Sequence, residues 1–123
     1  MRVLKTLQFD KWARKEGVTD PTLWAAVIEM ENGLIDADLG GHLVKKRIAL
    51  PGRGKRGGAR SLLAYRLGDC AFFVYGFAKN ERDNIDDSEL KALKLLASTL
   101  LGWTPEQTGH ALREGAWIEV IHD

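Results

Sequence analysis

A small α+β domain with an antiparallel sheet is the fold class that the sequence predicts, on three observations. The chain has 123 residues, 45% hydrophobic and 28% charged, which suits one globular domain with a single core. Segments with helical periodicity lie towards both ends, with strand-like segments between them. The run 70–77 is apolar without alternation, which is typical of a central strand covered on both faces. We therefore expect residues 1–123 to form one domain, with N-terminal and C-terminal helices packed on a small sheet.

Apolar spacing and capping residues predict four helices, over residues 8–16, 20–33, 86–101 and 104–114. Gly17 and Gly33 are expected to end the first two, because glycine suits the residue after a helix. Asp86 and Thr104 are each followed three residues later by Glu or Gln, which is the capping-box spacing. The last two helices should therefore begin at these residues.

Strand-like segments predict the sheet, over residues 42–50, 61–66, 70–77 and 117–121, with a further N-terminal strand near 3–7. Residues 36–41 are rich in Asp and Gly and read as a connector. Five of the eight residues in 51–58 are Gly or Pro, so we expect a cationic loop without regular structure there.

The net charge of +1 conceals a strong asymmetry along the chain. Residues 42–66 contain eight cations and no Asp or Glu, so this segment carries +8 and the remainder carries −7. The eight are Lys45, Lys46, Arg47, Arg53, Lys55, Arg56, Arg60 and Arg66. Such an imbalance within one domain indicates a polyanionic partner, and we expect RNA. The alternative is a solvated hairpin that is basic by chance.

Other functions find little support in the sequence. Residues 52–57 match G-x-G-x-x-G, but a strand rather than a helix is expected to follow, so the dinucleotide interpretation is rejected. The three histidines, His42, His110 and His122, have no metal-ligand spacing, and we expect neither a metal nor a cofactor.

The compartment is predicted from what the sequence lacks. No window resembles a signal peptide or a membrane span, and Cys70, the one cysteine, cannot form an internal disulfide. We therefore expect a cytoplasmic protein with no membrane partner.

Cationic side chains suit RNA cleavage without a metal. The 2′-OH of the substrate attacks the adjacent phosphorus, so the protein must remove one proton, stabilise the added negative charge and help the 5′ oxygen to leave. Arginine binds phosphate in bidentate fashion, and a lysine crowded by other cations has a lowered pKa.

Three motifs carry a resemblance to a known family. They are Lys46-Arg47-Ile48, then Gly-x-Gly-Lys-Arg-Gly-Gly-x-Arg at 52–60 before a Tyr-bearing strand, then Tyr-Gly-Phe-Ala-Lys-Asn-Glu at 75–81. The chain resembles the RelE/HigB-like toxins of bacterial type II toxin–antitoxin systems, within the RelE/ParE superfamily, most closely over residues 45–90. The resemblance implies a curved antiparallel sheet, cleavage of mRNA on the ribosome and inhibition of translation, with a cognate antitoxin as partner.

The resemblance also implies site residues. It assigns Arg60 as the phosphate clamp, with Lys79 and Lys55 as further catalytic residues. The implied RNA-binding residues are Lys45, Lys46, Arg47, Arg53, Arg56 and Arg82. Several relatives carry a catalytic Tyr or His near the C-terminus. His122 lies in this part of the chain and could serve as an acid or a base, but we interpret it as a frayed terminal residue. Residues 104–123 exceed a minimal toxin and are expected as a C-terminal extension.

Two other classes remain open at this stage. ParE-like toxins share the fold but inhibit DNA gyrase, and they would not need an acid-free block of cations at the sheet. A nucleic-acid-binding module without catalysis is the other alternative.

Overall fold

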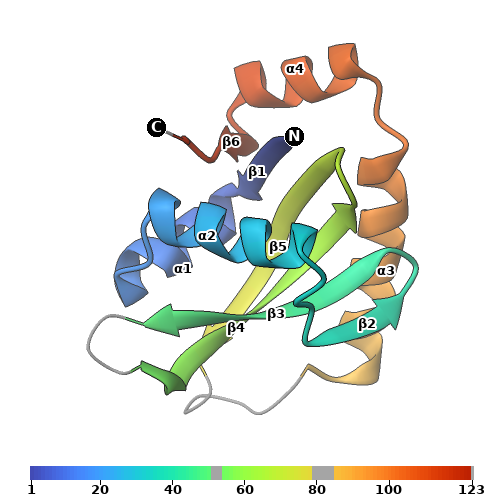
Figure 1. Cartoon of the computed structure of the whole chain (residues 1–123). Helices are drawn as coiled ribbons and strands as arrows, with labels where there is room; N and C mark the ends of the chain where they lie inside the picture. The colour runs from blue at the N-terminus through green and yellow to red at the C-terminus, as the bar shows by residue number, and fades with distance from the viewer. Residues whose placement is uncertain (51–53, 79–84, 123) are drawn as a thin grey trace.

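The fold is built on a sheet whose strands come from both ends and the middle of the chain (Figure 1). The computed structural model describes residues 1–50, 54–78 and 85–122, with the side chains of 54–57 left aside. In chain order its elements are β1 (Arg2–Thr6), α1 (Leu7–Glu16), α2 (Asp20–Glu31), β2 (Ala37–Gly40), β3 (Leu43–Leu50), β4 (Gly54–Arg66), β5 (Cys70–Ala78), α3 (Asp87–Leu101), α4 (Pro105–Glu114) and β6 (Trp117–Glu119).

The strands form one sheet in the order β2-β3-β4-β5-β1-β6. Neighbours from β2 to β5 are antiparallel, and β6 is antiparallel to β1. β1 instead pairs parallel with β5, so the predicted α+β class is confirmed while the sheet is mixed rather than wholly antiparallel. Val3 and Leu4 point to opposite faces and are both buried, so β1 needs a place inside the sheet, between β5 and β6.

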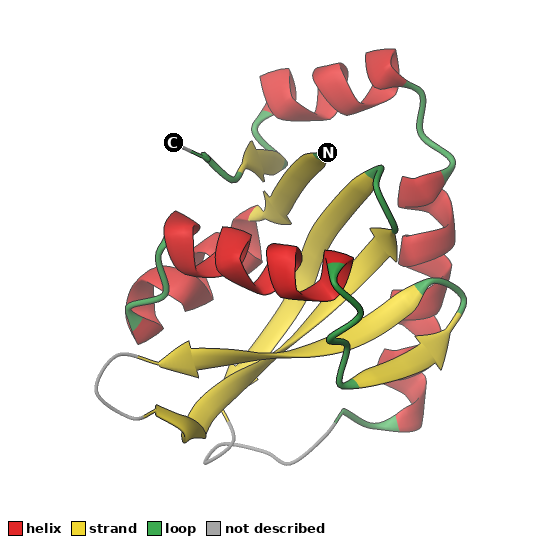
Figure 2. Cartoon of the chain, in the orientation of Figure 1, coloured by secondary structure: helices red, strands yellow, loops and turns green. Residues whose placement is uncertain are grey.

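Helices cover the sheet on both faces (Figure 2). On one, the α1/α2 face, Phe9, Leu23 and Met30 pack with Ile48 and Phe73 in one hydrophobic cluster. On the other, the α3 face, a second cluster joins α3 and α4 to the sheet through Ala97, Leu100, Ala111, Leu4, Leu62 and Phe72. Outside the irregular positions of the sheet, side chains along each strand alternate between the two clusters, and this alternation determines to which face a charged residue points.

The predicted helices are confirmed, and so are both capping boxes. The Asp86 side chain accepts from Glu89 N–H and the Thr104 side chain from Gln107 N–H, with the reciprocal bonds present in each case. The C-terminal segment joins the same sheet, because β6 pairs with β1 and Trp117 meets Phe72 edge-to-face at 5.3 Å. Residues 104–122 therefore contribute to the sheet and to the core.

Two local predictions were wrong. The expected loop 51–58 holds the start of β4, because Gly54 pairs with Leu50 of β3; residues 51–53 lie outside the described residues. The expected connector 36–41 contains the edge strand β2. In both places backbone pairing with β3 outweighs the low strand propensity of Gly and Asp, since the partner strand supplies the hydrogen bonds.

One glycine is required by packing against α1. A Cβ atom built on Gly76 of β5 would lie 2.5 Å from the Trp12 ring, well inside van der Waals contact. Trp12 also stacks at a tilt on Phe9, at 5.3 Å between ring centroids. Only glycine at position 76 lets the indole lie flat against the strand and hold α1 on the sheet.

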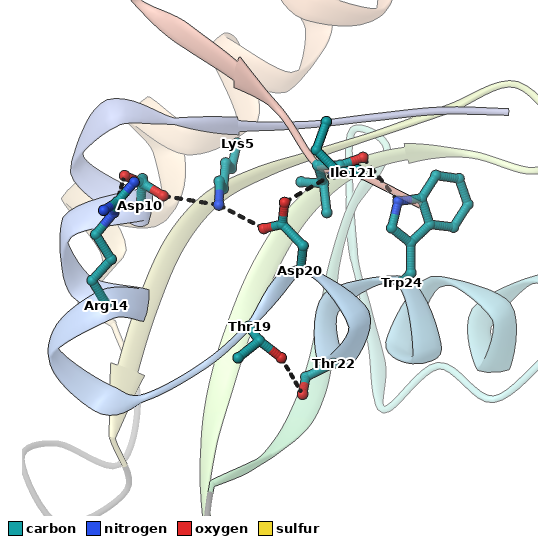
Figure 3. Close-up of polar contacts among 9 residues, drawn as sticks. Lys5, Asp10, Arg14, Thr19, Asp20, Thr22, Trp24 and Ile121 are labelled. Atoms are coloured by element: carbon teal, nitrogen blue, oxygen red, sulfur yellow. Dashed lines mark hydrogen bonds and ion pairs between the residues drawn. The ribbon is translucent and has the colours of Figure 1, made fainter. Parts of the chain in front are cut away.

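A buried ammonium group joins four parts of the chain (Figure 3). Lys5 Nζ of β1 lies 2.8 Å from Asp10 Oδ1 of α1 and 2.8 Å from Asp20 Oδ1 of α2. Arg14 donates to Asp10 Oδ2, and Ile121 N–H donates to Asp20 Oδ2 at 2.9 Å. The Lys5 and Asp10 side chains are each 8% exposed, so removing either partner leaves a buried, uncompensated charge.

The buried charges shift each other's pKa. Burial alone lowers the pKa of Lys5, but the hydrogen bonds and charges of Asp10 and Asp20 outweigh it and hold that pKa above its ordinary value. Burial alone raises the pKa of Asp10, but Lys5 and Arg14 hold it below its ordinary value. Asp10 therefore stabilises the fold above its unfolded pKa of roughly 3.9, and this contribution is lost as the pH falls through the lower folded pKa.

We expect Asp10→Asn to lower the free energy of unfolding by about 2 kcal/mol at pH 7, because Lys5 loses one of its two buried partners. The deficit should be smaller at roughly pH 3, because below roughly 3.9 the unfolded chain takes up a proton at Asp10 and the advantage of the ionised carboxylate in the folded chain decreases. Urea unfolding at both pH values measures this, with Asp87→Asn, an exposed carboxylate, as the matched control. A deficit that does not change with pH would contradict the ionic explanation.

Candidate nucleic-acid interface

Strand alternation separates the three consecutive cations of β3. Val44, Lys46 and Ile48 point to the α1/α2 face, where Val44 and Ile48 belong to the core. Lys45 and Arg47 point the other way, to the face on which Leu43 is buried against α3. The predicted basic block is therefore divided between two surfaces, and only part of it can meet a single ligand.

A β-bulge in β5 turns two aromatic side chains to the same face as Lys45 and Arg47. The register with β4 runs from Leu63 opposite Phe73 to Leu62 opposite Tyr75, so Val74 is an extra residue. Phe73 lies in the α1/α2 core, and strict alternation would place Tyr75 there as well. The bulge instead places Tyr75 beside the α3 cluster and Phe77 two residues further along the same face.

The pairing registers arrange these residues as two rows across three strands. One row is Lys45, Leu62 and Tyr75, and the next row is Arg47, Arg60 and Phe77. Directly paired residues on one face lie roughly 5 Å apart between Cβ atoms. Arg60 therefore lies between Arg47 on one side and the Phe77 ring on the other. The Tyr75 and Phe77 rings are 6.0 Å apart between centroids.

Arg60 has a buried hydrogen-bond donor without an acceptor in the described part of the chain. Its Nη1 atom is buried, and within the described chain it has no hydrogen-bond partner. Leaving a buried donor unsatisfied costs about 1–3 kcal/mol, more for charged groups, so native proteins rarely do so without a reason. The neighbouring Arg47 is 54% exposed, with Nε 3.6 Å from Asp36 Oδ1. These two guanidinium groups can bind an anionic oxygen from the α3 side of the sheet.

Lys46 belongs to the fold rather than to this face. Its side chain is 7% exposed, and Nζ lies 2.8 Å from Glu29 Oε1 of α2 and donates to the Leu34 carbonyl at 2.9 Å. Both contacts tie β3 to the end of α2. The chain therefore keeps Lys46 away from a ligand bound at Arg60.

The remaining predicted site residues are placed only in part. Lys55 and Arg56 lie in β4, on the strand that carries Arg60, and their side chains are outside what the structure describes. Arg53, Lys79 and Arg82 lie outside the described residues. These five assignments remain predictions.

His122 lies away from Arg60. Its ring stacks on Trp24 of α2 at 4.3 Å between centroids, and Trp24 packs against the α1/α2 core. Trp24 Nε1 also donates to the Val120 carbonyl at 2.9 Å, which holds the C-terminal segment on this side of the sheet. His122 is therefore held against α2 rather than frayed as expected, and it lies on the side of the sheet opposite Arg60.

Sequence reasoning missed two neighbours of Arg60 on this face, the half-buried Tyr75 and Phe77, which is 2% exposed. Their spacing of two in a strand is a signal for a shared face, but the apolar run around them hides which face it is. Within residues 1–50, 54–78 and 85–122, no group of three His, Cys, Asp or Glu side chains comes together as a metal site. Among those residues, too, no helix has the length and apolar character needed to cross a membrane.

The fold and this face together define a small α+β protein in which Arg47 and Arg60 lie beside the half-buried Tyr75 and the buried Phe77 on the α3 face of the sheet. Its sequence matches the family described as the RelE toxin of the RelE/RelB toxin–antitoxin system, over residues 1–120. The chain therefore belongs to the RelE toxin family, is the toxin of a toxin–antitoxin system and has an antitoxin as its partner. A comparison with curated proteins finds no match. The family predicted from the motifs is confirmed.

If Arg60 is kept for a ligand at the expense of stability, Arg60→Met should raise the free energy of unfolding by about 1 kcal/mol, because it removes the unsatisfied donor. Lys46→Met should lower it by about 1–2 kcal/mol, because the Leu34 carbonyl and Glu29 lose their partner. Urea unfolding of both variants tests the contrast. Equal destabilisation by the two substitutions would show that Arg60 is held for the fold.

Proposed function

We propose that this toxin is a metal-independent endoribonuclease that cleaves mRNA on the ribosome in the cytoplasm and so inhibits translation until the antitoxin neutralises it. The observation that carries the proposal is the buried, unpartnered Nη1 of Arg60, with the exposed Arg47 on one side of it and the buried Phe77 and half-buried Tyr75 on the other. Cations next to the half-buried Tyr75 ring suit single-stranded RNA, because its phosphates attract cations and its unpaired bases stack on aromatic rings.

The reaction requires charge stabilisation more than any special nucleophile. The 2′ oxygen forms a bond to phosphorus and loses its proton to a base, and the bond from phosphorus to the 5′ oxygen breaks as that oxygen gains a proton. The products are a 2′,3′-cyclic phosphate and a free 5′-OH. A guanidinium group that is fixed before the substrate binds stabilises the extra negative charge on phosphorus without reorganisation.

Within this proposal, Arg60 stabilises the transition state, while Lys45 and Arg47 hold flanking phosphates. Lys55 and Lys79 supply the lysines that the family resemblance assigns to catalysis, and Arg53, Arg56 and Arg82 extend the RNA contacts. Lys46 is left out of the interface, because Glu29 and the Leu34 carbonyl already occupy its ammonium group.

We expect Arg60→Ala to reduce single-turnover cleavage by on the order of 10²–10³ while changing ribosome affinity little, because its charge acts mainly in the transition state. The matched control is Arg66→Ala, which removes the same charge from the far end of the same strand, where Arg66 contacts Asp69. Primer extension on translated messages measures cleavage, and circular dichroism checks the fold.

Three outcomes would contradict the proposal in different ways. Equal losses of binding and cleavage would make Arg60 a docking contact. Full activity of Arg60→Ala would place the active site elsewhere. Intact messages together with inhibited DNA supercoiling would replace ribonuclease activity with gyrase inhibition.

A second expected outcome concerns salt. If Lys45 and Arg47 contact phosphates, the double substitution to Ala should reduce the slope of log affinity against log salt by roughly 1.4 for single-stranded RNA, since each contact contributes roughly 0.7. Titration of a single-stranded RNA oligonucleotide at several salt concentrations gives the slope, with Arg66→Ala as the control. An unchanged slope in the double variant would mean that Lys45 and Arg47 do not contact the phosphates of the RNA.

A further inference from the structure

One cation of the basic block lies away from the candidate interface. Arg66 ends β4, and Arg60 lies six residues earlier on the same strand. A strand rises roughly 3.3 Å per residue, so roughly 20 Å separates the two Cα atoms. Arg66 contacts Asp69 of the β4–β5 turn at 3.2 Å, and 47% of its side chain is exposed. Its charge therefore belongs to a different surface from that of Arg60.

A cavity of about 290 Å³ opens beside Arg66. It is lined by β1, the β4–β5 hairpin, the end of α3 and the first turn of α4. Figure 1 shows the β4–β5 turn next to the connection between α3 and α4. Pockets that hold small molecules begin at roughly 300 Å³ and are mostly apolar with a few polar groups. The size of this cavity therefore suits a small molecule rather than a polymer.

The floor of the cavity is apolar. It consists of four buried side chains, those of Leu4, Phe72, Leu100 and Leu101. The half-buried Trp103 adds an aromatic wall, and its ring meets Phe72 edge-to-face at 6.2 Å between centroids. Water gains little from such a surface, so an apolar group that displaces it is favoured.

The mouth of the cavity is cationic. Arg2 and Arg66 both line it, and Asp69 is the one acidic residue among the described lining residues. Arg2 Nε lies 3.6 Å from Glu119 Oε2, and Arg66 Nη1 lies 3.2 Å from Asp69 Oδ2. Each contact involves one nitrogen of a guanidinium group that carries five N–H donors, and exposed pairs of this kind contribute little to stability. Both arginines can therefore donate to an anion that enters the mouth.

One kind of ligand fits both the mouth and the floor. Two cationic side chains and one anionic side chain give the lining a net charge of +1, which attracts an anion. The floor requires the rest of the ligand to be apolar, because burying a polar group without a hydrogen-bond partner is costly. An organic anion with an apolar body meets both requirements, whereas a metal ion or an inorganic anion does not.

We propose that this toxin binds a small carboxylate with an apolar body in the cavity between the β4–β5 turn and the α3–α4 connection. The body lies on Phe72 and Leu100, and the carboxylate accepts hydrogen bonds from Arg66 and Arg2. The bound molecule joins β1 and β5 to the last two helices, so it stabilises the folded chain by mass action. This site is separate from the cationic face around Arg60 and does not depend on the ribonuclease chemistry proposed above.

Binding of 4-phenylbutyrate tests the proposal, because this molecule joins a phenyl ring to a carboxylate. Isothermal titration calorimetry on the full chain should give a Kd on the order of 1 mM or lower. The neutral 4-phenylbutanamide keeps the shape and should bind about tenfold more weakly. Acetate keeps the charge without the ring and should not bind measurably.

A pair of arginine substitutions locates the site. Arg66→Gln should raise the Kd of 4-phenylbutyrate about fivefold, because the carboxylate loses a charged donor. The matched control is Arg113→Gln, at an exposed position of α4 outside the cavity, and it should leave the Kd unchanged.

Cys70 gives a second measurement on the unsubstituted chain. It is the one cysteine of the sequence, it lines the cavity and it is partly exposed. Alkylation of its thiol by N-ethylmaleimide should slow in proportion to the fraction of chains with 4-phenylbutyrate bound, because the ligand covers the sulfur.

Four outcomes would overturn the proposal: no binding of 4-phenylbutyrate, equal affinity for the carboxylate and the amide, a Kd that Arg66→Gln leaves unchanged, and alkylation of Cys70 that the ligand does not slow. None of these measurements uses RNA. A chain that binds the carboxylate but leaves messages intact would therefore contradict only the proposed ribonuclease.

Discussion

The buried ammonium group of Lys5 determines how the first two helices meet the sheet. Asp10 and Asp20 each stand in the first turn of a helix, where the helix dipole also favours negative charge, and both bind the same Nζ. Asp20 uses its second oxygen to hold the C-terminal segment at Ile121. With α2 anchored in this way, Glu29 can reach Lys46, and the groove between α2 and β3 takes its shape.

The cationic face is a product of sheet geometry as much as of composition. Alternation sends Lys46 to the α1/α2 side and leaves Arg47 beside Arg60. The extra residue Val74 then changes the phase of β5, so that Tyr75 and Phe77 join these arginines. Without the bulge, the rings would point towards the core around Trp12, where Gly76 leaves room only for that indole.

Arg47 is held at the edge of the sheet by Asp36, which accepts its backbone N–H and lies 3.6 Å from its side chain. Its side chain faces the row that contains Arg60, while its backbone belongs to the outer edge of β3.

The sequence by itself determined the α+β class, the four helices with their capping boxes and the family, because periodicity, caps and motifs are local signals. The tertiary structure decided four further features. Lys46 is buried and paired with Glu29, β4 begins at Gly54 opposite Leu50, β1 lies parallel to β5, and Tyr75 lies on the same face as Arg60. Each of these depends on the register between strands far apart in the chain. A shift of one residue in that register moves a side chain to the opposite face, and nothing local in the sequence records it.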